Sequence, residues 1–226
     1  MDHSAHAVLF DIDGTLVDST YHHAIAWQRA FDRIGKPYPL WRIHRAVGMG
    51  GDKLVADVGD DEVEDRFGDE LRDMWHEEYS KLKAEVFPLP GATELVRTLK
   101  KAGFTVALAS SGDEDFSREA VATLGINDDV AVLTTSADVD ASKPDPDLLE
   151  VTLDRLDGVT HAVFVGDTPY DAKSAAAAGL KCIGLRSGGY SEAELLEGGA
   201  VLVVDLPEDL LELDWEQYLS TVGDES

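Results

Sequence analysis

Short apolar runs alternate with helix-spaced apolar positions through most of the chain after residue 86. Continuous apolar runs are typical of buried parallel strands, whereas apolar residues three and four apart are typical of helices that cover a sheet. Strands are predicted at Thr105–Ala109, Ala131–Leu133, Ala162–Val165, Cys182–Leu185 and Val201–Val204. Helices are predicted between them, at Ala92–Ala102, Phe116–Leu124, Pro146–Leu156 and Asp171–Ala178. This alternation predicts an α/β fold with a doubly wound parallel sheet.

One further strand precedes this series, and a long helical segment separates it from the rest. The apolar run Val8–Phe10 leads directly into Asp11-Ile12-Asp13-Gly14-Thr15. From Leu16 to Val86 the pattern predicts no strand but three helices, at Tyr21–Ile34, Trp41–Val47 and Glu62–Leu82. Such a block is too long for a simple crossover between strands. We therefore expect residues 1–15 and 87–226 to form a core and residues 16–86 an inserted helical unit.

The formal net charge of −26 over 226 residues restricts the partners of this chain. Nucleic acids and anionic membranes both attract a basic face, so neither is an expected partner. The single cysteine, Cys182, excludes an internal disulfide and indicates a reducing compartment. The first residues show neither a signal peptide nor a membrane span. A cytoplasmic protein is expected, with its acidic residues interpreted as solvated surface.

Polar residues follow the predicted strands at the ends where α/β proteins place their ligands. Asp11 and Asp13 follow the first strand, and Gly14 allows the chain to turn sharply. Ser110 and Ser111 follow the second strand, Lys143 lies in a later turn, and Asp167 and Asp171 follow the strand Ala162–Val165. Carboxylates this close repel one another unless a cation lies between them. The pattern therefore predicts a cation that prefers oxygen ligands, usually Mg²⁺.

Together, these four segments resemble the haloacid dehalogenase superfamily of phosphohydrolases. Asp11 to Thr15 matches the first motif, Asp-x-Asp-Gly-Thr, without a departure. Ser110 and Lys143 match the second and third motifs, and Gly166 to Asp171 matches the fourth. The resemblance spans the whole chain and implies a Rossmann-like core with a helical cap between the first two motifs, most similar to the phosphoglycolate phosphatase-like branch. Because Asp13 is present, the resemblance implies phosphate transfer and not carbon–halogen or carbon–phosphorus cleavage.

The resemblance also implies a role for each motif residue. Asp11 is expected to attack phosphorus and form an aspartyl phosphate, with Asp13 as general acid and base. Mg²⁺ is expected at Asp11, the Asp13 backbone carbonyl, Asp167 and, through a water, Asp171. Ser110, Ser111 and Lys143 are expected to bind the phosphoryl oxygens. The implied substrate is a small phosphorylated metabolite.

Candidate substrate residues in the helical segment rest on weaker patterns. Gly50, Gly51 and Lys53 belong to a glycine-rich stretch that is either a substrate-specificity loop or a plain helix connection. His23 resembles a histidine at the cap hinge of relatives, although a helix-surface histidine is the simpler interpretation. Arg45 and Lys53 are either substrate contacts or solvated cations. The aromatic residues of this segment are predicted to form its own core: Trp27, Phe31, Trp75 and Tyr79.

Two other functions compete with a phosphatase. A sugar-phosphate mutase uses the same core chemistry, but it tends to carry basic residues where this chain has Val47 and Gly51. A phospho-aspartate receiver domain also uses acidic residues, a hydroxyl and a lysine, yet it has no helical insertion. The pattern does not specify an oligomeric state, so a monomer and a homodimer are both expected forms.

Overall fold

The apolar strands form one sheet in the computed structural model, which describes residue 3 and residues 5–222. Six parallel strands lie in the order β3-β2-β1-β4-β5-β6. Their bounds are β1 His6–Phe10, β2 Thr105–Ala109, β3 Val132–Thr134, β4 His161–Gly166, β5 Lys181–Leu185 and β6 Ala200–Val204. A short strand that was not predicted, β7 Ser220–Thr221, pairs antiparallel with the start of β4. The predicted α/β fold with a Rossmann-like parallel sheet is confirmed.

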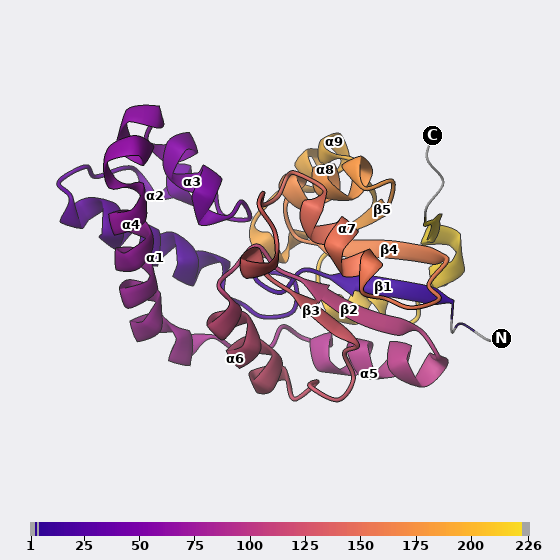
Figure 1. Cartoon of the computed structure of the whole chain (residues 1–226). Coiled ribbons are helices and arrows are strands. Elements are labelled where there is room, and N and C mark those ends of the chain that lie inside the picture. Colours follow the sequence, from indigo (N-terminus) through magenta and orange to yellow (C-terminus); the bar gives the residue numbers. More distant parts are fainter. Residues whose placement is uncertain (1–2, 4, 223–226) are drawn as a thin grey trace.

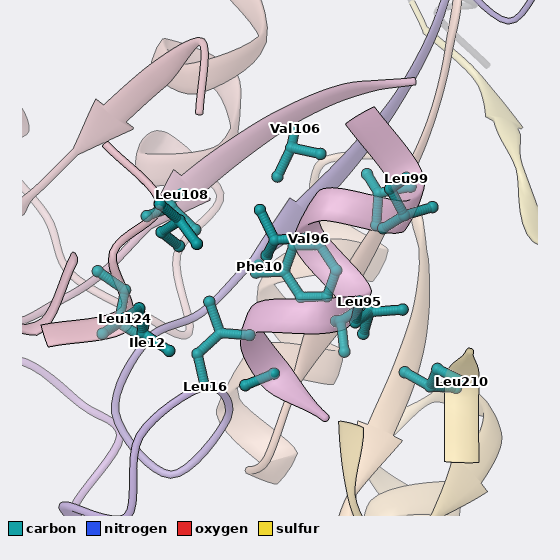
Figure 2. Packing of buried hydrophobic residues seen from close by; sticks show 14 of the residues in the cluster. Phe10, Ile12, Leu16, Leu95, Val96, Leu99, Val106, Leu108, Leu124 and Leu210 are labelled. Atoms are coloured by element: carbon teal, nitrogen blue, oxygen red, sulfur yellow. The ribbon is translucent and has the colours of Figure 1, made fainter. Parts of the chain in front are cut away.

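Helices cover both faces of this sheet (Figure 1). On one face, α5 Ala92–Ala102 and α6 Glu114–Leu124 pack over β1 and β2. Figure 2 shows this packing, with Phe10 from β1 beside Val96 of α5 and Leu108 of β2. On the other face lie α7 Asp147–Asp154, α8 Pro169–Ala177 and α9 Glu192–Gly198, the last of which was not predicted. Alternate residues of each strand therefore enter two separate apolar clusters.

Four helices form a separate group beside the carboxyl ends of the strands, which we call the helical module (Figure 1). They are α1 Thr20–Arg33, α2 Leu40–His44, α3 Gly51–Val58 and α4 Asp61–Leu82. Trp27 and Phe31 are buried in the module's own apolar cluster, with Trp75 packed against it. Tyr79 packs in a smaller cluster with Phe116 of the core. Apart from Tyr79, the predicted aromatic core therefore lies inside the module.

The bounds of two module helices differ from the sequence prediction. The predicted helix at Trp41–Val47 is shorter, because α2 ends at His44. Residues 51–53 were predicted as part of a glycine-rich loop, but they form the first turn of α3. Gly50 precedes this helix in an extended conformation, and its backbone N–H donates a hydrogen bond to Ser142 Oγ in the core. A tertiary contact therefore helps to set the start of α3.

The connection between β1 and the module belongs to the core packing. Leu16 and Val17 are fully buried and lie in the same apolar cluster as β1 and α5, and Figure 2 shows Leu16 facing α5. Val17 also bridges Pro88, where the chain returns from the module. The helices of the module therefore begin beyond these two residues, at Thr20. Among the described residues, no helix is long and apolar enough to cross a membrane.

Candidate active site

The motif residues meet at the carboxyl edge of the sheet, as predicted. Asp11 directly follows β1, and its backbone N–H donates to the carbonyl of Val165 in β4. Ser110 directly follows β2, and its N–H donates to the carbonyl of Thr134 in β3. Each polar residue thus continues the ladder of its strand by one hydrogen bond. This continuation fixes the backbone of the site to the most buried part of the fold.

Lys143 places a buried positive charge between two carboxylates. Its Nζ lies 2.5 Å from Asp11 Oδ1 and 2.8 Å from Asp171 Oδ1, and its side chain is 1% exposed. Burial alone would lower the pKa of Lys143, but the charges of Asp11 and Asp171 raise it above its usual value. Lys143 is therefore a permanent cation in the site. Its two bonds also fix the orientation of the Asp11 carboxylate.

Asp171 is held by the start of helix α8. Its Oδ2 accepts hydrogen bonds from the Thr168 hydroxyl at 2.7 Å and from the backbone N–H groups of Thr168 and Asp167 at 2.9 and 3.2 Å. Thr168 in turn caps the helix by accepting from the Asp171 N–H. This capping box occupies one oxygen of Asp171 and leaves the other to face Lys143.

Three carboxylates form a set that fits a divalent cation. Asp11, Asp167 and Asp171 each place an oxygen within 4.8 Å of the others. Asp167 Oδ2 is buried and has no hydrogen-bond partner in the described part of the chain. Burial first, and then the neighbouring acidic side chains, raise the pKa of Asp11 to about 7 and that of Asp167 well above its usual value. A hard cation with oxygen ligands would satisfy these groups in their ionised form.

Two glycines make room for Asp167. A Cβ at Gly14 would lie 2.3 Å from Asp167 Oδ2, and one at Gly188 would lie 1.9 Å from the same atom. Gly14 also has a φ of +79°, a conformation that side chains rarely adopt. Gly14 belongs to the motif that the sequence revealed. Gly188 was missed, because its role depends on the distant loop that carries Asp167.

Asp13 lies in a hydrogen-bond set of its own. Its Oδ1 accepts from Ser19 Oγ at 2.6 Å and lies 2.9 Å from His23 Nε2. The His23 ring is stacked on Tyr79, with 3.9 Å between the ring centroids. Burial acts to raise the pKa of Asp13, but the interactions with His23 and Ser19 outweigh it, so the pKa lies below its usual value. Asp13 is therefore an ionised carboxylate with a proton donor in contact.

The hydroxyl residues line the same cavity as Asp11 and Asp13. Ser110 Oγ accepts from the Gly112 N–H at 3.0 Å, and Ser111 Oγ accepts from the Lys143 N–H at 3.4 Å. A Cβ at Gly112 would lie 3.2 Å from Asp13 Oδ2, which shows how closely the loop after β2 approaches Asp13. The hydroxyls of Ser110 and Ser111 thus line the space beside the two leading carboxylates, while the Lys143 ammonium contacts Asp11 without being part of the lining.

A cavity of about 430 Å³ extends from these carboxylates into the helical module. From the module it is lined by apolar residues and by part of α4: Trp27, Val47, Met49, Leu54, Arg72, Asp73, Trp75 and His76. The core contributes a polar wall of Ser110, Ser111, Gly112, Asp113, Asp140 and Ser142. Arg72, Asp73 and His76 of α4 were missed at the sequence level, and Trp75 was predicted only as part of the segment's own core. Their helix was predicted, but the face that it turns to the cavity depends on how the module packs.

The four candidates from the helical segment occupy different places. His23 and Gly51 line the cavity. Gly50 lies behind the lining, where its N–H binds Ser142. Lys53 does not line the cavity; its Nζ lies 2.5 Å from Asp145 Oδ2 and also donates to the carbonyl of Ser142. Lys53 therefore joins the module to the core and is not placed as a substrate contact.

A second set of contacts joins the module to the core at Arg45. Its guanidinium pairs with Glu194 and lies over the ring of Tyr190, 4.0 Å from the centroid. Its carbonyl accepts hydrogen bonds from the hydroxyls of Tyr170 and Tyr190, at 2.7 and 2.8 Å. Arg45 and Lys53 thus hold the module over the carboxyl edge of the sheet, with the cavity between the two parts.

Comparison with known proteins identifies relatives over most of the chain. The family model for haloacid dehalogenase-like hydrolases matches residues 5–179. A validoxylamine A 7'-phosphate phosphatase of Streptomyces hygroscopicus subsp. limoneus is 30% identical over 205 residues, which is 88% of this chain and 93% of the relative. A phosphoglycolate phosphatase of Pseudomonas putida is 29% identical over 80% of this chain and 69% of its own length.

A mutase and a solved structure extend the comparison. The β-phosphoglucomutase of Bacillus subtilis is 25% identical over 94% of this chain and 96% of its own length. The crystal structure of a hydrolase from Pseudomonas syringae superimposes with a TM-score of 0.86 at 33% identity, and covers 91% of this chain and 95% of that one. The chain belongs to the haloacid dehalogenase-like hydrolase family, in the phosphoglycolate phosphatase-like branch, and is a phosphoric monoester hydrolase.

Proposed function

We propose that the chain is a Mg²⁺-dependent phosphatase that hydrolyses a small phosphorylated metabolite through a phosphoryl group on Asp11. One observation carries the proposal: the Asp11 carboxylate lies between a buried lysine and two further carboxylates, while Asp13 is held apart by its own hydrogen bonds. Two adjacent aspartates thus have different environments, which suits a nucleophile and a separate acid and base. Bound at Asp11, Asp167 and Asp171, Mg²⁺ would supply charge neutralisation between the nucleophile and the phosphate.

In the first step, an oxygen of Asp11 attacks phosphorus and the bond to the leaving oxygen breaks. Asp13 delivers a proton to that oxygen; because Asp13 is ionised beforehand, it must first take up this proton, and His23 Nε2, 2.9 Å from Asp13 Oδ1, is placed to supply it. In the second step, Asp13 takes a proton from the water that attacks the phosphoryl group and restores Asp11. Lys143 and the hydroxyls of Ser110 and Ser111 stabilise the phosphoryl oxygens in both steps.

The lining of the cavity favours a leaving group that carries hydroxyl or amine groups and no carboxylate. Arg72 is already bound to Glu64, Asp69 and the carbonyl of Gly51. Besides the carboxylates of the site, the other charged residues of the lining are Asp52, Asp73, Asp113 and Asp140, and none of the four has an ion pair among the described residues. An added carboxylate would therefore meet negative charge without a free cation to pair with. The stacked rings of Trp27 and Trp75 offer an apolar face for a ring-shaped leaving group.

The lining of the cavity supports neither of the two competing functions. Val47 and Gly51, where mutases tend to carry basic residues, both line it and provide no side-chain donor for a second phosphate. We therefore propose water, and not a sugar hydroxyl, as the acceptor of the phosphoryl group. The receiver-domain alternative does not fit, because the chain belongs to a hydrolase family.

Removal of divalent cations is expected to abolish turnover. Without a cation, the carboxylates of Asp11, Asp167 and Asp171 repel one another, and the raised pKa values of Asp11 and Asp167 favour their protonated forms, so Asp11 loses its nucleophilic form. The measurement is phosphate release from an aryl phosphate in excess chelator and after Mg²⁺ is added back. Full activity in chelator would contradict the proposed role of the carboxylates.

The substrate preference is expected to depend on the charge of the leaving group. Phosphoglycolate carries a carboxylate, so we expect its kcat/KM to be at least about tenfold below that of a cyclitol or hexitol phosphate. Asp73→Lys adds a cation to the cavity and should narrow this ratio. Asp65→Lys makes the same change on α4 outside the lining and serves as the matched control. An unchanged ratio in Asp73→Lys, or a preference for phosphoglycolate in the unmodified enzyme, would contradict the charge argument.

A further inference from the structure

A cluster of histidines lies at the amino ends of the strands, at the edge of the sheet opposite the active site. His6 begins β1 and pairs in register with His161, the first residue of β4. His3 lies one turn before His6, whose backbone N–H donates to the His3 carbonyl at 2.9 Å. Three of the seven histidines of the chain therefore gather at this edge. Figure 1 shows the start of β1 and the C-terminal segment side by side here, far from the helical module.

The donor atoms of this cluster have the spacing of metal ligands. His3 Nδ1 lies 3.4 Å from His6 Nδ1 and 3.7 Å from Glu216 Oε1. All three residues place a donor atom within 4.8 Å of the others. Ligands at about 2.0–2.2 Å from a tetrahedral ion are separated from one another by about 3.3–3.6 Å. The 3.4 Å between the two histidine nitrogens lies within this range, and the 3.7 Å from His3 Nδ1 to the Glu216 carboxylate oxygen is close to it. Both distances are those of the structure without any movement of the side chains.

Packing around the cluster orients the imidazole rings. The ring of His3 is stacked on buried Phe104, with 4.5 Å between centroids and 11° between planes. His6 meets the edge of His161, with 5.4 Å between centroids. His161 itself is held by its own hydrogen bond, since its Nδ1 lies 2.9 Å from Thr160 Oγ1. A preset ring orientation lowers the entropy that must be lost when a ligand binds.

We propose that His3, His6 and Glu216 form a second cation site, selective for a transition-metal ion such as Zn²⁺. Two imidazole nitrogens and one carboxylate suit Zn²⁺, Co²⁺ or Ni²⁺, whereas Mg²⁺ prefers the all-oxygen set at Asp11, Asp167 and Asp171. The net charge of −26 further attracts cations to the surface. The site is open on one side, because the Glu216 side chain is 46% exposed, so water completes the coordination.

Binding at this site would connect the two ends of the described chain. His3 and His6 belong to the N-terminal segment, and Glu216 belongs to the short helix Trp215–Tyr218 that precedes β7. An ion held by all three residues binds the folded state and not the unfolded chain. Zn²⁺ is therefore expected to raise the melting temperature without a requirement for catalysis.

The test is a Zn²⁺ titration by calorimetry with millimolar Mg²⁺ present throughout, so that the carboxylate site is occupied. We expect one saturable Zn²⁺ site per chain and a Zn²⁺-dependent rise in melting temperature. Glu216→Gln and His3→Gln should each weaken binding by about tenfold or more and remove the thermal shift. Glu212→Gln, an exposed change in the same C-terminal segment, is the matched control. A Co²⁺ titration should give ligand-field absorption bands that the two site variants lose.

The result that overturns the proposal is Zn²⁺ binding that is absent, or that is equal in the unmodified chain and both site variants. All readouts use binding and melting, so they do not depend on turnover. Glu216→Gln is conservative and lies at the surface, so its fold should survive and loss of binding can be assigned to the ligand itself.

Discussion

Asp13→Asn is expected to lower kcat for alkyl phosphates, whose leaving groups need a proton, by about 10²–10⁴-fold, the usual contribution of general acid–base catalysis. The substitution keeps Asp11, Lys143 and the three-carboxylate set, because Asp13 lies outside that set and binds Ser19 and His23. The introduced amide can neither deliver nor accept the proton. With a poor leaving group, both the phosphorylation of Asp11 and the hydrolysis of the phosphoryl-enzyme are therefore expected to slow. The measurement is kcat for an alkyl phosphate against kcat for an aryl phosphate.

An aryl phosphate distinguishes the two steps in this variant. Its leaving group needs little protonation, so Asp11 should still be phosphorylated. Attack by water still lacks its base, and the phosphoryl-enzyme should accumulate. Asp18→Asn is the control, since Asp18 lies outside the cavity lining near the same turn. Equal losses of activity with both substrates and no accumulation would remove Asp13 from its acid–base role.

Lys143→Ala is the second large effect that we expect, at about 10²–10³-fold in kcat with Mg²⁺ present. The lysine is buried between Asp11 and Asp171, and Arg72, the one lysine or arginine that lines the cavity among the described residues, is already bound to Glu64 and Asp69. Removal of one partner from a buried ion pair also costs about 3–5 kcal/mol of stability in the absence of a compensating cation.

Stability and catalysis must therefore be measured separately for Lys143. Circular dichroism on heating reports the first, and initial rates at saturating Mg²⁺ report the second. Lys173→Ala removes an exposed lysine from α8 and is the matched control. If Lys143→Ala kept normal kcat and lost only stability, Lys143 would be a structural residue of the loop before α7 and not a phosphate-binding one.

The core of the site could be predicted because its residues directly follow strands. Asp11, Ser110 and Asp167 each come immediately after an apolar run, and parallel strands bring such positions to one edge. The pattern of these three strands was clear, since each is buried on both faces after its first residue and carries no polar interruption there. Lys143 was harder to place from physics alone, because it reaches the site from a loop.

The parts that could not be predicted depend on contacts between distant segments. Helix α9 is short and acidic and has one fully buried residue, Leu195, so its apolar period is too brief to detect. The glycines before α3 are typical of a loop, yet the contact of Gly50 with Ser142 sets where the helix begins. Lys53 looked like a free cation, but its partner Asp145 lies 92 residues away in the chain.

The central claim is that Asp11 carries the phosphoryl group, and intact-protein mass spectrometry after mixing with an aryl phosphate tests it most directly. The account predicts a phosphoryl adduct on Asp13→Asn that hydroxylamine removes and that peptide mapping places on Asp11. It predicts no adduct on Asp11→Asn under the same conditions. An adduct that persists in Asp11→Asn, or that maps to another residue in Asp13→Asn, would contradict the account.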